Sequence, residues 1–381
     1  MITRYAQLCP IIFGTGSVRQ VGAEVKNLGS KKVMLISDET ISKLEAYTNC
    51  LNSLMEAGLE VVPFNKVVPD PPDYIVNEGG ELAKSEQIDG IVALGGGSVI
   101  DAAKAINVLV NNPLPVNLYL GNPIYNPGVP VVVIPTTAGT GSESTIMGVV
   151  TDTSKQVKSA VLCPATLGIL DPEVTLDVPP TVTAYTGMDA FAHAAEAITT
   201  KFSNPKSEAL ALEAIRTITN YLPIAVADGK NIVAREKMLL ASNFAGMAFN
   251  DALVHLGHAI AHAVGATFHK AHGIICALAL PEVMKYAATI TPEKVKLIGE
   301  AMGVTIGGDD TADEIGEVVA TSIRKLIKSI GISSIKELGI TKDDYTALAD
   351  MVMEDVCFQY APKQLSKFEV VSILEAVYEN Y

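Results

Sequence analysis

The chain has 381 residues, of which 49% are apolar and 18% charged, so it has ample material for buried cores. Its formal net charge of −14 argues against binding to nucleic acid, whose affinity comes mainly from lysine and arginine contacts to phosphate, and against anionic membrane surfaces. The length suggests two domains of roughly 100–200 residues each, and the absence of an 18-residue apolar run predicts no transmembrane helix.

The cysteines and the first residues indicate the cellular compartment. Five cysteines are scattered along the chain, and none forms a Cys-x-x-Cys pair, which is typical of reduced thiols. The N-terminal residues lack the basic and then apolar pattern of a signal peptide. We therefore expect a cytoplasmic protein.

The first 175 residues alternate short apolar runs with helical stretches. Continuous apolar runs of four or five residues predict strands that are buried on both faces. Helical patterns between the runs predict βαβ units and hence a mostly parallel sheet. The predicted strands are residues 33–36, 60–64, 90–94, 131–134 and 167–170.

From about residue 180 the sequence changes to long stretches rich in alanine, leucine, methionine and glutamate. Pro179 and Pro180 mark the boundary, because proline disfavours helix in the residue before it and is accepted at a helix start. We therefore predict an α/β domain over residues 1–178 and an all-α domain over residues 179–381. The predicted helices are residues 183–200, 205–221, 233–249, 251–268, 273–288, 311–330 and 366–379.

Three glycines and a serine at residues 95–98 follow a predicted strand and open a helix. Glycine lets the backbone approach a ligand closely, and a helix N-terminus offers free N–H groups to an anion. This placement favours a pyrophosphate site. The alternative is a plain strand-to-helix turn, and the motif is not the Gly-x-Gly-x-x-Gly fingerprint of the ordinary Rossmann fold.

Two further polar positions follow predicted strands. The turn at residues 135–143 places threonine and serine hydroxyls where open α/β sheets bind ligands, and Ser142 lacks the context of a hydrolase elbow. Asp38 follows the strand 33–36, where a carboxylate can accept hydrogen bonds from both hydroxyls of an adenosine ribose. The alternative role for Asp38 is an N-cap for the next helix.

Five of the six histidines fall between residues 255 and 272, all in the predicted helical domain. The i, i+4 spacing places Asp189 and His193 on one helix face, and His258 and His262 on another. A single histidine on an apolar helix is usually a core residue, but five in so short a segment indicate a metal centre. A carboxylate with several imidazoles suits Fe(II), Zn(II), Ni(II) or Co(II) better than Mg(II) or Ca(II).

Four ordered motifs carry a resemblance to a known family. They are Gly-Gly-Gly-Ser at 95–98, Pro-Thr-Thr-Ala-Gly-Thr-Gly-Ser-Glu at 135–143, Gly-Met-Asp-Ala-x-x-His at 187–193, and His-x-x-x-His-x-x-Gly leading to His-Gly at 258–273. With these motifs the chain resembles the iron-containing (group III) alcohol dehydrogenases over essentially its whole length. The resemblance implies a dinucleotide-binding N-terminal domain, a metal- and substrate-binding C-terminal domain, and a homodimer that involves residues 11–13.

The resemblance also implies a role for individual residues. The implied metal ligands are Asp189, His193, His258 and His272, while His262 lies near the nicotinamide without being a ligand. The implied dinucleotide contacts are Gly95, Gly96, Gly97, Ser98, Asp101, Thr136, Thr137 and Thr140. Lys158 is implied to contact the ribose near the nicotinamide. Asp38 lies where the NAD-preferring members of the family carry an aspartate. His255 shares a predicted helix face with His258 and His262, so it either supports the metal ligands or packs in the core. In an alternative alignment of the histidine motif, His255 is itself a ligand.

We therefore expect an NAD-dependent, metal-dependent oxidoreductase that interconverts a small primary alcohol and its aldehyde by hydride transfer. The metal, Fe(II) or alternatively Zn(II), acts as a Lewis acid on the substrate oxygen. His262 is the candidate proton relay, because imidazole titrates near neutral pH, and its alternative role is packing against the nicotinamide. His269 and Lys270 precede the implied ligand His272, and could hold a small anionic group on the substrate.

Three alternative functions stay open at this point. A metal- and NAD-dependent lyase of the dehydroquinate synthase type needs several lysines or arginines for its phosphorylated substrate, and residues 187–273 offer few. The second alternative is polyol oxidation of the glycerol dehydrogenase type. The third is a non-catalytic sensor, which no appended DNA-binding or receiver segment supports.

Overall fold

The computed structural model describes residues 7–337, 339 and 341–381. The described residues form two compact units, and each is treated by itself. The α/β unit comprises residues 7–137 and 141–177, and the helical unit comprises residues 138–140 and the described residues from 178 onward. Among the described residues, none of the helices has the length and apolar character that spanning a membrane requires.

A six-stranded sheet forms the centre of the α/β unit, and all of its strand pairs are parallel. The strand order is β1-β8-β5-β4-β2-β3. The strands are β1 (Ile11–Phe13), β2 (Lys32–Asp38), β3 (Glu60–Val67), β4 (Gly90–Gly95), β5 (Val131–Pro135) and β8 (Leu167–Leu170). All five predicted strands are therefore present.

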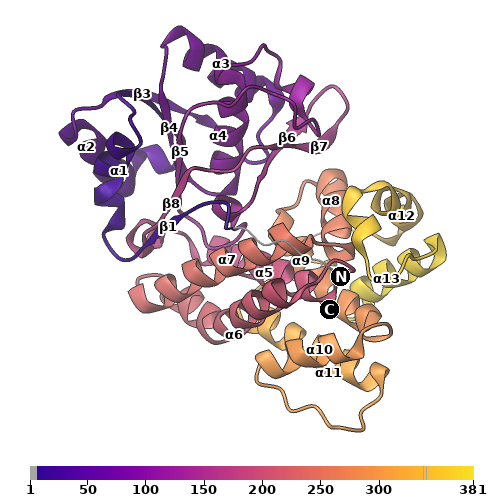
Figure 1. The fold of residues 1–381 in the computed structure, drawn as a ribbon. Coiled ribbons are helices and arrows are strands. Elements are labelled where there is room, and N and C mark those ends of the chain that lie inside the picture. Colours follow the sequence, from indigo (N-terminus) through magenta and orange to yellow (C-terminus); the bar gives the residue numbers. More distant parts are fainter. Residues whose placement is uncertain (1–6, 338, 340) are drawn as a thin grey trace. The chain divides into compact units, whose positions relative to one another are not determined.

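Helices cover both faces of this sheet (Figure 1). On one side lie α1 (Val21–Asn27) and α2 (Glu45–Glu56), and on the other lie α3 (Asp73–Ser85) and α4 (Gly97–Val110). A separate hydrophobic core lies on each face of the sheet. Strand β4 is apolar throughout because its residues pack alternately into the two cores, with Ile91 and Ala93 on one face and Val92 and Leu94 on the other. The predicted fold class is confirmed.

The prediction missed three strands of the α/β unit. Strand β1 has only three residues and pairs with β8 at the edge of the sheet. Strands β6 (Met147–Asp152) and β7 (Val157–Leu162) form a separate antiparallel pair. Buried and partly exposed residues alternate along β6, and most of β7 is at least partly exposed, so neither gives the continuous apolar run of a strand buried on both faces.

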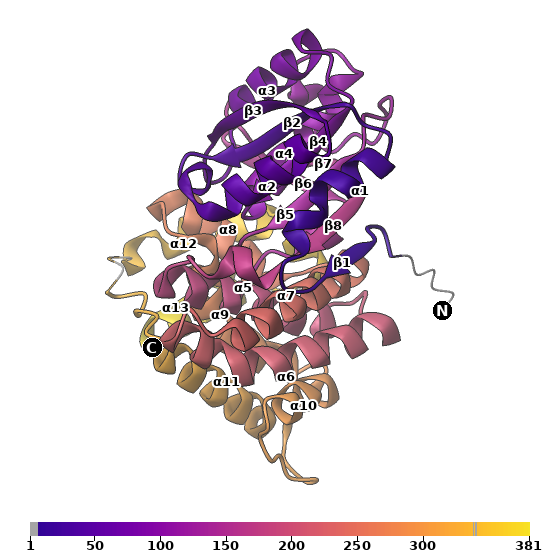
Figure 2. The ribbon, with the colours of Figure 1, turned by 90° about the vertical axis from the view of Figure 1, so that its left-hand side faces the viewer.

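Among its described residues, the helical unit contains all seven predicted helices and two more. Its central helix is α5 (Pro180–Thr199), which packs against α6, α7 and α9 (Figure 2). Helix α5 is buried from Gly187 to Thr199. The others are α6 (Pro205–Ala227), α7 (Ile232–Ala252), α8 (Leu256–Phe268), α9 (His272–Ala288), α10 (Pro292–Ala301), α11 (Ala312–Ser329), α12 (Tyr345–Glu354) and α13 (Lys367–Glu379). Helices α10 and α12 were not predicted.

The predicted helix at 251–268 is wrong at its start. Helix α7 continues to Ala252, and α8 begins only at Leu256. Between them Leu253 has φ 66° and ψ 170°, a backbone conformation that breaks the helix. His255 therefore precedes α8, and the predicted helix face shared by His255, His258 and His262 does not exist.

Candidate metal centre and dinucleotide-binding turns

One face of α5 carries the acidic and imidazole groups of the candidate metal centre. Asp189, His193 and Glu196 are spaced i, i+4 and i+7, and all three are buried. The start of α9 approaches the backbone of α5 closely: a Cβ on Gly273 would lie 2.3 Å from the carbonyl oxygen of Tyr185. This close approach, which only glycine permits, brings His272 Nε2 to 3.6 Å from Asp189 Oδ1.

Four side chains form a compact group of potential ligands. One ligand atom from each of Asp189, His258, His272 and Cys276 lies within 4.8 Å of the others. The imidazole of His193 stacks on that of His258, with ring centroids 4.6 Å apart. The structure therefore gathers three of the predicted ligands in one group and places the fourth against it.

Cys276 was missed by the sequence analysis. It follows His272 by one helical turn, and its Sγ lies 3.4 Å from His272 Nε2. The i, i+4 spacing from His272 could have identified it. Burial, with the nearby carboxylates of Asp189 and Glu196, raises the pKa of the Cys276 thiol well above its usual value. Without a metal the thiol is therefore protonated, whereas a bound cation would favour the thiolate, which is the form that metals bind.

The residues present fit a divalent metal. Across the part of the chain that the structure describes, Asp189 Oδ1, His193 Nδ1 and His258 Nε2 are buried polar atoms without a hydrogen-bond partner. Each such atom costs roughly 1–3 kcal/mol if nothing satisfies it. Their concentration in one group, together with the borderline donor chemistry of carboxylate and imidazole, matches an iron or zinc site.

The charge state of His193 also suits a ligand. Burial lowers its pKa to about 4, and the neighbouring His258 lowers it too, although Asp189 opposes both effects. His193 is therefore neutral near pH 7, which leaves an imidazole lone pair for a metal.

Two carboxylates that the sequence analysis did not single out contact the imidazoles. Glu196 Oε2 lies 2.6 Å from His258 Nδ1, and Asp355 Oδ2 lies 2.9 Å from His262 Nδ1. The ring of His262 stacks on that of His272, with centroids 5.2 Å apart. These partners are 62 and 93 residues away from their histidines, so no local spacing could have revealed them.

The remaining residues of the histidine segment lie in different surroundings. His255 is fully buried, and its Nε2 lies 2.8 Å from the hydroxyl of Thr199. His269 ends α8 in the left-handed conformation and is exposed, whereas Lys270 is half-buried. Among the described residues, the ammonium of Lys270 has no hydrogen-bond or ion-pair partner. Within the described part of the chain, His255 Nδ1 is also buried without a hydrogen-bond partner, but His255 lies outside the group formed by Asp189, His258, His272 and Cys276, and the geometry therefore does not favour it as a ligand.

The glycine turn of the α/β unit joins β4 to α4. Gly96 is the N-cap of α4, and no side chain caps this end of the helix. A Cβ on Gly96 would meet the hydroxyl of Thr137 at 3.4 Å, so the turn after β5 lies beside the glycine turn. Thr136 is buried, and its N–H donates to the carbonyl of Gly95. Thr140 belongs to the helical unit.

The other predicted dinucleotide contacts make bonds within the protein. Asp38 Oδ1 accepts 2.8 Å hydrogen bonds from the N–H groups of Thr40 and Ile41 in the loop after β2. The N-cap of the short helix that follows (Ile41–Lys43) is Thr40 and that of α2 is Leu44, so the alternative role of Asp38 as an N-cap is wrong. Asp101 accepts a hydrogen bond from Ser142, Lys158 pairs with Asp70 at 2.7 Å, and Ser98 accepts a bond from the Asp70 N–H.

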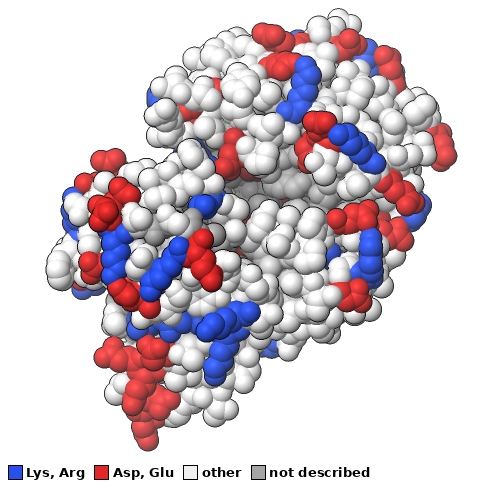
Figure 3. Space-filling model, turned by 180° about the vertical axis from the view of Figure 1, so that it is seen from behind, with Lys and Arg blue, Asp and Glu red and all other residues white. Residues whose placement is uncertain are grey.

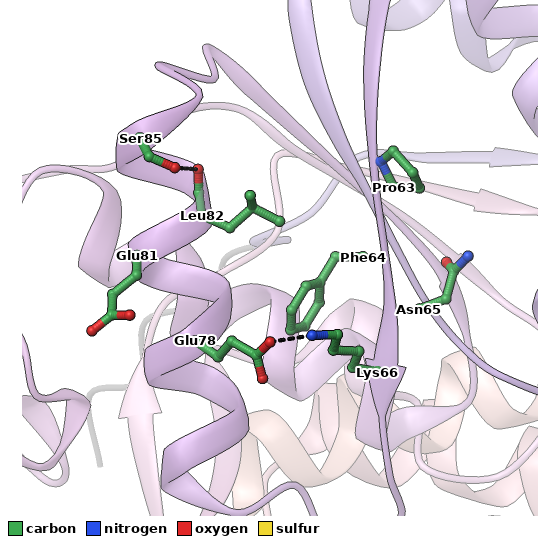
Figure 4. Close-up of a pocket in the computed structure, with 8 residues that line it drawn as sticks. All are labelled: Pro63, Phe64, Asn65, Lys66, Glu78, Glu81, Leu82 and Ser85. Carbon is green, nitrogen blue, oxygen red and sulfur yellow. Dashed lines mark hydrogen bonds and ion pairs between the residues drawn. The ribbon is translucent and has the colours of Figure 1, made fainter.

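A surface pocket of about 500 Å³ lies elsewhere in the α/β unit, between β3 and α3 (Figure 4). Phe64 and Leu82 supply apolar lining, and an ion pair joins Lys66 to Glu78. None of the predicted site residues lines it. The pocket therefore adds nothing to the candidate metal centre or the glycine turn.

Comparison with known proteins identifies the family. The family model for iron-containing alcohol dehydrogenase matches residues 10–172, and the model for the C-terminal part of the Fe-containing alcohol dehydrogenase family matches residues 183–378. The chain belongs to the iron-containing alcohol dehydrogenase family. The predicted family, the reaction class of alcohol and aldehyde interconversion, and the cofactor pair of NAD and a divalent metal are confirmed at this level.

Individual relatives cover nearly the whole chain. An NAD-dependent methanol dehydrogenase of Bacillus methanolicus is 37% identical over 369 residues, which cover 96% of this chain and 97% of the relative. The crystal structure of a 1,3-propanediol oxidoreductase matches with a TM-score of 0.95 and 36% identity, covering 99% and 100% of the two chains. A sulfoacetaldehyde reductase of Bifidobacterium kashiwanohense, solved in complex with NAD⁺, matches with a TM-score of 0.88 and 26% identity over the full length of both chains.

Proposed function

We propose that this family member holds a divalent metal with Asp189, His193, His258 and His272, and uses it to interconvert a small primary alcohol and its aldehyde with NAD. The observation that carries the proposal is the group of buried atoms on Asp189, His193 and His258 without hydrogen-bond partners. We favour His193 over Cys276 as the fourth ligand, because His193 Nδ1 is a buried atom without a hydrogen-bond partner among the described residues and the family resemblance gives His193 this role. Fe(II) is the proposed metal, with Zn(II) as the alternative.

A metal held by these four residues would supply Lewis acidity at the substrate oxygen, and bound NAD would supply the acceptor or donor of the hydride. The protein's own groups hold the ligands and move the proton. Asp355 holds His262 through Nδ1, which leaves Nε2 as the nitrogen that exchanges a proton with the substrate oxygen. The stacking of His262 on His272 keeps this imidazole beside the metal ligands.

We further propose that residues 1–178 bind NAD and residues 179–381 bind metal and substrate. In the first segment the uncapped N-terminus of α4 would receive the pyrophosphate, contacted by the glycine turn and by Thr136 and Thr137. Asp101 and Thr140 remain proposed contacts. Asp38 and Lys158 would contact the two riboses, with Asp38 keeping its bonds to the N–H groups of Thr40 and Ile41 through Oδ1.

The proposed substrate class includes aldehydes with a small anionic group. Lys270 supports this because it is half-buried, lies two residues before His272 and has no ion-pair partner among the described residues. His269 is adjacent and could assist. One similar solved protein is named a sulfoacetaldehyde reductase, which is consistent with an anionic substrate.

The decisive experiment is anaerobic NADH oxidation by metal-stripped protein that is reconstituted separately with Fe(II) and with Zn(II). The aldehyde panel pairs neutral and anionic compounds of equal length. We expect metal to restore activity, and His262→Ala to lower kcat by roughly 10²–10⁴-fold. NAD that binds tightly but is not turned over with any metal would contradict the proposal and favour a lyase or a sensor.

The same panel tests the substrate class. We expect Lys270→Ala to raise KM for anionic aldehydes and to leave KM for their neutral counterparts unchanged. An equal rise for both kinds of aldehyde would exclude an anion-binding role for Lys270.

We also propose a cytoplasmic homodimer. The five cysteines are all free and buried, in keeping with a reducing compartment. Strand β1 is an edge strand of the sheet, and its side chain Phe13 is 40% exposed, so this edge can pair with a second copy. The face shown in Figure 3 carries interspersed acidic and basic side chains, which gives no support for a nucleic-acid partner.

A further inference from the structure

Glu196 is a buried carboxylate that contacts three donors at the start of α8. Its Oε2 accepts from the N–H of His255 at 2.9 Å and lies 2.6 Å from His258 Nδ1, and its Oε1 accepts from the N–H of Gly257. Its side chain is completely buried. No side chain of its own caps the start of α8, and the Glu196 carboxylate from α5 takes this place. Its negative charge also interacts favourably with the positive end of the α8 helix dipole.

The contact with His258 fixes which of its nitrogens carries the proton. An ionised carboxylate can only accept, so His258 Nδ1 must be the protonated nitrogen. Both oxygens of Glu196 already accept backbone N–H bonds, from His255 and Gly257, so Oε2 faces His258 Nδ1 as an acceptor. A neutral His258 with its proton on Nδ1 carries its lone pair on Nε2, the buried atom without a partner in the candidate metal centre.

His255 completes the arrangement around this carboxylate. The Thr199 hydroxyl donates to the carbonyl of Ala195 at 3.0 Å, so it accepts from His255 Nε2. This bond anchors His255 one turn of α5 beyond Glu196. The backbone N–H of His255 is one of the three donors that hold Glu196.

We propose that Glu196 is a positioning residue for the metal: its carboxylate orients the His258 ring and presents Nε2 to the cation. The proposal rests on the proposed metal site. A second carboxylate beside the ligand set also balances the charge of a buried dication, since Asp189 is the only anion among the four proposed ligands. Outer partners of this kind typically strengthen metal binding by 10–100-fold.

Gly257 gives an independent way to displace the carboxylate. A Cβ at this position would lie 2.5 Å from Glu196 Oε1, so alanine must push Glu196 aside while leaving every proposed ligand in the sequence. A matched control is Glu282, another buried glutamate of the helical unit, which pairs with Arg324 and Asn380 instead of a histidine.

The test measures the Zn(II) affinity of the metal-stripped full chain by competition with a chelator, and the absorption spectrum of the Co(II)-loaded chain. We expect Glu196→Gln and Gly257→Ala to weaken Zn(II) binding by about 10–100-fold and to alter the Co(II) spectrum. Glu282→Gln should change the affinity by less than about threefold, and circular dichroism establishes that each variant is folded.

The outcomes separate this inference from the proposed function. Wild-type protein that does not bind Zn(II), or binds it as weakly as His272→Ala, would overturn the metal site itself. Tight binding by wild type, weak binding by His272→Ala and unchanged binding by folded Glu196→Gln would overturn only the role of Glu196. If Glu196→Gln does not fold, Gly257→Ala decides by the same criteria. Lower stability with unchanged Zn(II) affinity and an unchanged Co(II) spectrum would show a purely structural role.

Discussion

Lys104 in α4 is completely buried, and its ammonium is satisfied almost entirely by backbone carbonyl groups. Its Nζ donates to the carbonyls of Ser142, Thr145 and Met147 at 2.6, 2.8 and 2.8 Å. Burial lowers the pKa of Lys104, while the charge of Asp101 opposes the shift. One lysine thus fixes the polar turn beside the proposed dinucleotide contacts, although it need not touch the cofactor.

Replacing this ammonium should destabilise the protein. In Lys104→Met the apolar stem is kept, but the buried carbonyls of Ser142 and Thr145 and the partly buried carbonyl of Met147 lose the ammonium as a donor. We expect the free energy of unfolding to fall by about 2–4 kcal/mol in urea titrations followed by circular dichroism. The matched control is Lys43→Met, which removes an exposed ion pair with Glu39 and should change stability by less than about 0.5 kcal/mol. Equal effects of the two substitutions would contradict this account.

At the scale of single residues, the sequence predicts what lies within one helical turn. The spacing of Asp189 and His193 predicted a shared face, and α5 places them so. The resemblance supplied His258 and His272, which the structure brings to Asp189. Glu196 and Asp355 escaped prediction because each contacts its histidine through tertiary packing, and their acidic type is common on solvated helix faces.

The break between α7 and α8 shows what sets an element boundary here. Residues 251–268 are apolar enough for one continuous helix, yet Leu253 adopts φ 66° and ψ 170°, a region that is strained for any residue with a Cβ. The break redirects the chain so that the N–H groups of His255 and Gly257 both point to Glu196. The strained conformation of Leu253 therefore sets where α8 begins. The periodicity of the apolar residues alone could not reveal this break.

This strain makes a testable prediction about two substitutions at one site. Leu253→Ala and Leu253→Gly both remove the side chain, but only glycine adopts the backbone conformation freely. We expect the glycine variant to be more stable than the alanine variant by about 1 kcal/mol in chemical unfolding, the reverse of the usual order. The same pair at Phe249, inside α7, should show alanine as the more stable variant. Alanine being better at both positions would show that Leu253 carries no strain.

For the other elements, the degree of burial decides whether the sequence predicts them. The predicted strands β2, β4, β5 and β8 have almost wholly buried residues, so their apolar runs identify them. The pair β6 and β7 and the helices α10 and α12 are more exposed and carry mixed polar sequences, so their signals are weak. Tertiary contacts, which the local sequence does not encode, decide these segments.

At the scale of the whole molecule, the glycine turn that is proposed to bind NAD and the residues that are proposed to bind the metal fall in different units. The glycine turn belongs to the α/β unit, whereas Asp189, His193, His258 and His272 belong to the helical unit. The change of sequence pattern near residue 180 indicated where the architecture changes. It could not indicate that residues 138–140 group with the helical unit, because this depends on packing such as the close approach of Gly139 to Thr186.

This division predicts where each ligand slows amide hydrogen exchange in the intact chain. NAD added to metal-stripped protein should protect residues 95–101 most strongly, at the start of α4. A divalent metal without NAD should protect α5 near Asp189 and the first turns of α8 and α9. At a ligand concentration 100 times its dissociation constant, the opening that releases the ligand becomes roughly 2.7 kcal/mol less favourable, which is easily measured by mass spectrometry.

Ligand variants make the exchange experiment decisive. Asp189→Asn should abolish protection by the metal and leave protection by NAD intact, since the two sets of residues do not overlap. Protection of residues 95–101 by the metal alone, or NAD protection that starts in α5 and spares α4, would contradict the assignment of NAD to residues 1–178. Because the measurement needs no substrate, it tests the division of labour between the units separately from the reaction.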